Sequence, residues 1–109
     1  MTKRLDCNQM VPDGAKAFDG VYGYVMQSGL PSELVDAICL RISQINNCAY
    51  CHDMYTHDLT EKGVEVEKPT LVQAWREGGG LFSAAERAAH SWAESVTRVA
   101  ETGASGSAR

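Results

Sequence analysis

The sequence predicts an all-α fold of about five helices, and two observations support this prediction. Apolar residues recur three and four positions apart over most of the chain, which is the spacing of one face of a helix. No useful stretch alternates strictly between apolar and polar residues, as a half-buried strand would. The 109 residues are expected to form one domain over residues 1–101 and a small, polar tail over 102–109 that cannot order itself.

The first helix is expected over residues 13–27, where Ser28 and Gly29 end its apolar stripe. A second helix is expected to open at Pro31, because proline suits a first helical turn, and Glu33 suits the positive end of the helix dipole. This second helix is apolar on most sides, so it is expected to be central.

The third helix is expected from Cys48 to about Lys62, with Gly63 ending it. Asn46 and Asn47 are expected to cap its start through their side-chain oxygens. Two cysteines are therefore placed in a first helical turn.

A short helix is expected from Pro69 to about Glu77, and three glycines at 78–80 should break it. The last helix has the clearest start, because Ser83 and Glu86 have the spacing of a capping box.

Composition excludes several classes of function. The formal net charge is −4 and no dense run of Lys or Arg occurs, so we expect binding to neither nucleic acid nor an anionic membrane. No apolar run reaches the length of a membrane span, and residues 1–7 lack the apolar run of a secretion signal. The sequence therefore predicts a cytoplasmic protein.

A C-x-x-C pair, Cys48 and Cys51, is the main candidate for chemistry. Backbone N–H groups and the dipole at a helix start favour thiolate over thiol. Cysteines three residues apart on a helix can also close a disulfide without large backbone movement. This spacing therefore supports reversible cycling between a dithiol and a disulfide.

The neighbours of the pair on the third helix are polar as well as apolar. At about 100° per residue, one wedge of the helix collects the pair and three further side chains, while His57 points away. These three are His52, Tyr55 and Leu59.

Cysteines have three other common uses in proteins. Cys7 and Cys39 are expected to be small core residues. A closed zinc site needs four ligands and usually a second regular pair, which the sequence lacks, and a thioredoxin-like domain needs a βαβ context. Zinc binding through the pair and His52 is therefore the lesser alternative.

Residues 40–54, LRISQINNCAYCHDM, resemble the core of the AhpD-like alkylhydroperoxidase family, within the carboxymuconolactone decarboxylase superfamily. The resemblance extends over most of residues 15–97 and includes the segments AWRE at 74–77, LFS at 81–83 and RAAHSWAE at 87–94. It implies an all-helical AhpD-like fold that associates as homotrimers or homohexamers.

The resemblance also implies the roles of the two cysteines. Cys51 would attack a peroxide as the thiolate, and Cys48 would resolve the sulfenic acid into a disulfide. The electron donor would be a dithiol such as a lipoylated or thioredoxin-type protein, and no bound cofactor would be required. The expected function is thus peroxide reduction by a thiol-dependent oxidoreductase, an antioxidant activity of the peroxiredoxin kind.

This sequence departs from the family at the two positions of its proton relay. Asp36 stands where the family usually has glutamate, and Tyr55 stands where it has histidine. A phenol with a pKa near 10 is a poor base at neutral pH. His52, one turn from Cys48, is the candidate substitute base.

Two alternative functions remain open at this point. One is a non-peroxidase enzyme of the decarboxylase type, in which Asp36 and His52 would act on an organic acid. The other is a helical oligomer or redox-sensing module without catalysis.

Overall fold

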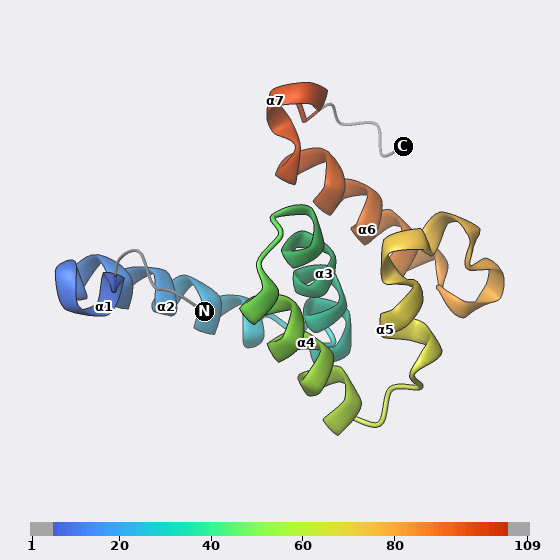
Figure 1. Cartoon of the computed structure of the whole chain (residues 1–109), viewed down its shortest axis with the longest axis horizontal. Coiled ribbons are helices and arrows are strands. Elements are labelled where there is room, and N and C mark those ends of the chain that lie inside the picture. The colour runs from blue at the N-terminus through green and yellow to red at the C-terminus, as the bar shows by residue number, and fades with distance from the viewer. Residues whose placement is uncertain (1–5, 105–109) are drawn as a thin grey trace. The chain divides into compact units, whose positions relative to one another are not determined.

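The computed structural model describes residues 6–104, apart from the side chain of Cys7, and over this range it is helical with no strand (Figure 1). The predicted all-α class is therefore confirmed. The chain divides into two compact units, Met1–Pro31 and Ser32–Arg109. The prediction that Cys7 is a core residue lies outside the described side chains.

The first unit contains α1 (Cys7–Met10), which the sequence did not predict, and α2 (Pro12–Met26). Proline at the start of α2 and Asp13 in its first turn suit the N-terminal end of a helix. The helix agrees with the predicted 13–27 to within one residue at each end. None of its residues is buried, and Phe18 is 79% exposed.

The second unit is built around α3 (Ser32–Ile45), which packs against α4 (Ala49–Glu61) and α6 (Ala84–Thr97). The prediction that this helix is central is confirmed, because Leu40 is fully buried and six residues of the helix are buried in all. Figure 1 shows α3 between α4 and α6.

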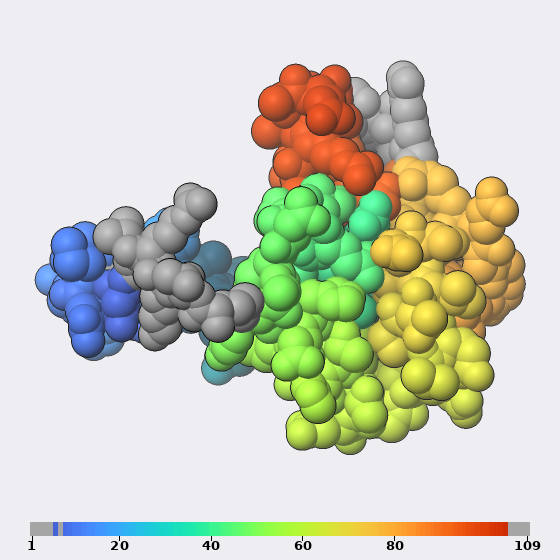
Figure 2. Space-filling model, viewed as in Figure 1, coloured from blue at the N-terminus to red at the C-terminus, as the bar shows by residue number. Residues whose placement is uncertain are grey.

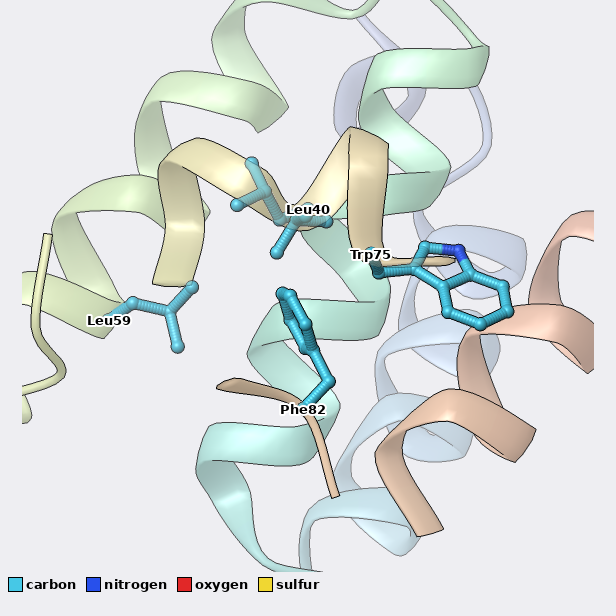
Figure 3. Close-up of a cluster of buried hydrophobic side chains, with 5 residues drawn as sticks. Leu40, Leu59, Trp75 and Phe82 are labelled. Carbon is cyan, nitrogen blue, oxygen red and sulfur yellow. The ribbon is translucent and has the colours of Figure 1, made fainter. Parts of the chain in front are cut away.

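An apolar cluster of five buried side chains holds this unit together. Figure 3 shows Leu40, Leu59 and Phe82 pointing toward one another, with Trp75 beside α6. Val72 completes the cluster, and Tyr55 packs against it from α4. The cluster thereby fixes the inner face of α4, leaving its other face on the surface that Figure 2 shows in green.

The segment between α4 and α6 differs from the expected single helix at 69–77. It begins earlier, as α5 (Glu67–Leu71), and continues as the 3₁₀ turn η1 (Val72–Glu77), inside which Ala74 leaves helical geometry. A second 3₁₀ turn, η2 (Gly79–Leu81), follows. Gly78 between them has a packing reason, since a Cβ there would lie 2.7 Å from the Phe82 ring.

The predicted capping box of the last helix is confirmed. The Ser83 hydroxyl accepts the Glu86 N–H at 3.2 Å, and the Glu86 carboxylate accepts the Ser83 N–H at 3.1 Å. The helical geometry of α6 is interrupted at Arg98, after which the chain forms α7 (Val99–Thr102). The predicted tail at 102–109 is described only as far as residue 104 and stays a prediction.

No helix within residues 6–104 combines the length and apolar content needed to cross a membrane.

Candidate active site

The turn between α3 and α4 holds the cysteine pair, and its backbone is tightly specified. The Cys48 N–H donates to the Ser43 carbonyl at 3.0 Å, and the Asn47 N–H donates to the Gln44 carbonyl at 3.2 Å. These two bonds are the Schellman pattern of a helix C-terminus, which needs a residue with positive φ. Asn47 supplies it with a φ of 56°, a conformation that asparagine tolerates better than most residues.

The cap of α4 is Cys48 itself, so the expectation that Asn46 and Asn47 supply capping oxygens is wrong. The Cys48 backbone is extended, and its Sγ accepts the N–H of Cys51 at 3.3 Å. Because Asn47 is already used to terminate α3, the next residue along the chain takes the cap. One cysteine therefore closes α3 with its N–H and opens α4 with its sulfur.

Cys48 and Cys51 are joined as a disulfide, with their Cα atoms 5.3 Å apart. This separation lies within the usual range for disulfides. When the bond is reduced, the N–H that faces Cys48 Sγ favours the thiolate form of that cysteine. The turn can thus support both states of a dithiol cycle.

A pocket of about 350 Å³ opens beside the pair. Figure 2 shows the outer surface of α4, the helix whose first turn forms part of the pocket wall. The polar residues of the wall are Ser43, Gln44, Asn47, Cys48, His52 and Gln73. The pocket therefore gives a solute access to the Cys48 side of the disulfide.

His52 is exposed and lies in this pocket, with its Nε2 3.5 Å from the amide nitrogen of Gln44. The amide oxygen of Gln44 accepts a bond from Arg41 at 3.3 Å, which leaves the NH₂ group facing His52. His52 thus lies beside the cysteine turn, with the amide group of Gln44 against its Nε2.

The two predicted relay residues come from α3 and α4, and neither forms part of the pocket wall. Asp36 is 1% exposed and forms an ion pair with Lys62. Tyr55 is half-buried and hydrogen-bonds the thiol of Cys39. Burial raises the pKa of Cys39, the Tyr55 bond lowers it and the charge of Asp36 raises it. The structure therefore groups Asp36, Tyr55 and Cys39, whereas His52 shares the pocket with Cys48.

His57 lies on the outside of α4, with Nε2 3.6 Å from Asp53, and both side chains are well exposed. Its expected separation from the cysteines follows from the helix geometry. Among residues 6–104, no three His, Cys, Asp or Glu side chains lie together in a way that could hold a metal ion.

Sequence reasoning missed three side chains around the site. Gln44 and Gln73 come to the pocket from α3 and η1, and Lys62 reaches Asp36 from the end of α4. Gln73 and Lys62 show no signal in the local sequence, because each gains its role through a partner on another element. Gln44 alone could be anticipated, as it lies one turn before Cys48.

The chain is similar in sequence and in structure to known proteins. Residues 12–95 match the sequence profile of the Carboxymuconolactone decarboxylase family. The uncharacterized protein YdfG of Bacillus subtilis (strain 168) is 30% identical over 99 residues, which cover 91% of this chain and 67% of YdfG.

A crystal structure from Agrobacterium tumefaciens has a TM-score of 0.86 and 34% sequence identity, covering 96% of this chain and 71% of that one. It is described as a protein of unknown function and a candidate antioxidant defence protein, AhpD. The profile match spans well over half of the chain, and the structural likeness extends over nearly all of it. The chain therefore belongs to the carboxymuconolactone decarboxylase family, as an AhpD-like member.

Proposed function

We propose that this protein is a thiol-dependent oxidoreductase that reduces peroxides through a dithiol–disulfide cycle at Cys48 and Cys51. The observation that carries the proposal is the disulfide between these residues at the first turn of α4, beside an open pocket. The description of the Agrobacterium structure as a candidate antioxidant defence protein supports the same activity.

The proposed cycle uses both thiols. The Cys51 thiolate attacks the outer oxygen of a hydroperoxide, the O–O bond breaks and an alcohol leaves after taking a proton. The Cys51 sulfenic acid then reacts with Cys48, which forms the disulfide and releases water. The N–H of Cys51 favours the thiolate that Cys48 needs for this second step. A thiol donor returns the pair to its reduced state.

His52 and Tyr55, the two groups considered for proton transfer, have different surroundings. His52 lies in the pocket with Cys48, and its imidazole is the proposed base for that thiol. Tyr55 and Asp36 lie with Cys39, where a phenol can donate a hydrogen bond but does not serve as a base. We therefore propose a slower peroxidase than one with histidine at position 55.

We also propose that the protein works as a homo-oligomer, a trimer or a hexamer. On the second unit, an apolar stripe on α6 contains Trp92 and Val96, which are 48% and 44% exposed, and Val99 on α7 is 53% exposed. Such an apolar stripe is typical of a surface that another subunit covers. Sedimentation velocity should give the mass of the assembly, and a monomer at all concentrations would contradict this part.

The test of the activity is peroxide turnover with cumene hydroperoxide and dithiothreitol as the electron donor. Cys51→Ser and Cys48→Ser are expected to lose the turnover while keeping the helical circular dichroism spectrum. Cys39→Ser is the matched control and is expected to retain it, because Cys39 is a free cysteine that takes no part in the disulfide. Turnover that survives Cys51→Ser would rule out the proposed cycle.

A further inference from the structure

The wall of the pocket beside Cys48 combines polar side chains with apolar surface, to which Ala49 contributes. Of the described residues that form its wall, none is Asp, Glu, Lys or Arg. Gln44 and Gln73 contribute amide groups, each of which can both donate and accept hydrogen bonds. A carboxylate entering this pocket would meet no Lys or Arg side chain to offset the hydration that it loses.

The size of the pocket matches a small molecule. Its volume of about 350 Å³ falls at the lower end of the range for small-molecule sites. It can hold a compound with several peptide-like groups, placed so that one atom reaches the sulfur of Cys48.

We propose that this pocket binds a neutral, amide-bearing thiol about the size of a short cysteinyl peptide, and that this thiol reduces the disulfide by attacking Cys48. The proposal rests on the proposed dithiol cycle and names its electron donor. It also assigns a specificity-determining role to Gln73, which reaches the pocket from η1.

The first chemical step occurs at Cys48 because this cysteine, and not Cys51, forms part of the pocket wall. The incoming thiol loses its proton to solvent, and the resulting thiolate attacks Cys48 Sγ. The bond between the two protein sulfurs breaks, and Cys51 leaves as a thiolate that takes a proton from solvent. The product is a mixed disulfide between the incoming thiol and Cys48.

The second step releases the protein. Another thiol molecule attacks the sulfur of the bound one, the mixed disulfide breaks and Cys48 leaves as a thiolate. The N–H of Cys51 lies 3.3 Å from Cys48 Sγ in the disulfide form, and a stabilised thiolate leaves faster. In sum, one protein disulfide and two thiols give two protein thiols and one small disulfide.

The test compares two thiols that differ only in charge, N-acetylcysteine amide and N-acetylcysteine. The protein is oxidised with diamide, so no peroxide is needed, and reduction is followed at equal thiolate concentrations in about 0.5 M sodium chloride, which screens the net negative charge. The amide is expected to react about tenfold faster, the effect of roughly one net hydrogen bond. Equal rates for the two thiols would overturn the proposal.

Two variants test whether Gln73 causes the preference for the amide thiol. Gln73→Leu is expected to reduce the tenfold preference to within about twofold. Gln27→Leu, a matched change at an exposed glutamine at the end of α2, is expected to leave it intact. A preference that persists in Gln73→Leu would refute the assignment of Gln73.

The attacked sulfur is identified by trapping. Cys51→Ser mixed with the disulfide of N-acetylcysteine amide is expected to form a mixed disulfide at Cys48 at least about tenfold faster than Cys48→Ser forms one at Cys51. Mass spectrometry of acid-quenched wild-type protein gives the same information without a variant. Trapping at Cys51 would overturn the choice of Cys48, and much faster reduction by thioredoxin than by either small thiol would overturn the choice of donor.

These experiments separate two kinds of failure. A protein without peroxidase activity can still show the amide preference and the trapping at Cys48, since neither measurement contains peroxide. Conversely, peroxide turnover with equal rates for the two thiols would leave the proposed function standing and remove this inference.

Discussion

The α3–α6 side of the second unit and the cysteine turn differ in how completely their polar groups are satisfied. On the first side, the buried carboxylate of Glu94 accepts bonds from Arg41 at 2.7 Å, Arg76 at 2.6 Å and Trp75 at 3.0 Å. At the turn, Cys48 Sγ accepts one N–H at 3.3 Å, and His52 is exposed.

This difference means that the residues that stabilise the unit are not the residues proposed to carry out the chemistry. The Glu94 contacts join residues up to 53 positions apart, so they hold α3, η1 and α6 together and cannot be lost without cost. The contacts of the turn are local and weak, so the disulfide can open and close while the rest of the unit stays folded. One residue departs from this pattern, because His90 is fully buried and neither of its ring nitrogens has a hydrogen-bond partner within residues 6–104.

The largest expected effect on the free energy of unfolding comes from removing the Glu94 carboxylate. Glu94→Ala leaves the buried guanidinium of Arg41 without its acidic partner, and breaking such a pair typically costs about 3–5 kcal/mol. Glu77→Ala, at an exposed position, is expected to change the free energy of unfolding by less than about 0.5 kcal/mol. Urea denaturation of both variants checks this, and a similar small loss in each would contradict the account of the network.

The second effect depends on pH and comes from His90. Its ring stacks on Trp75 with centroids 5.8 Å apart and meets the edge of Phe82 at the same distance. Burial lowers the pKa of His90 from 6.5 to about 4, against the opposing charges of Glu86 and Glu94, while Arg41 and Lys68 act in the same direction as burial.

The direction in which stability changes with pH follows from proton uptake by the unfolded chain. Between pH 6.5 and 4 the unfolded chain binds a proton at this position that the folded chain excludes, so the protein loses stability as pH falls through this window. The loss attributable to His90 should reach about 3 kcal/mol at pH 4 and be absent above pH 7. The difference in unfolding free energy between wild type and His90→Leu, measured at pH 7 and pH 4, should change by this amount. A constant difference would exclude the explanation.

A smaller effect is expected on activity. Tyr55→His places an imidazole one turn after Cys51, and peroxide turnover is expected to rise about tenfold. This is less than a well-positioned base usually contributes, because position 55 faces Cys39 and the apolar cluster. Tyr50→His, at an exposed site on α4, is the control and should give no gain. An unchanged turnover in Tyr55→His would place the limitation elsewhere in the cycle.

The smallest effect concerns the turn itself. Asn47→Gly should raise the free energy of unfolding by about 0.5–1 kcal/mol, because glycine accepts a φ of 56° without the steric cost of a side chain. Asn46→Gly, at the neighbouring residue without positive φ, should be neutral or destabilising. A gain in both variants would show that the left-handed conformation of Asn47 is not the cause.

Much of the fold could be predicted from local patterns. The capping box at Ser83, the central position of α3 and the placement of Cys48 at a helix start all follow from spacings of a few residues. The 3₁₀ turn at η1 could not be predicted, because its kink at Ala74 accommodates the packing of Val72 and Trp75.

The site was predictable only in part, for a similar reason. The disulfide pairing and the exclusion of His57 follow from helix geometry. The Asp36–Lys62 ion pair, the burial of His90 and the arrival of Gln73 at the pocket depend on which elements meet in space. A face of a helix is readable from its sequence, whereas the partner across that face is not.

The central claim is that Cys48 and Cys51 cycle between dithiol and disulfide when the protein meets a peroxide. The most direct measurement is a thiol count on the fully reduced protein before and after one equivalent of tert-butyl hydroperoxide, with peptide mapping of the product. The account predicts the rapid loss of two thiols per chain and a link between Cys48 and Cys51. Thiols that persist, or a disulfide that contains Cys39, would contradict it.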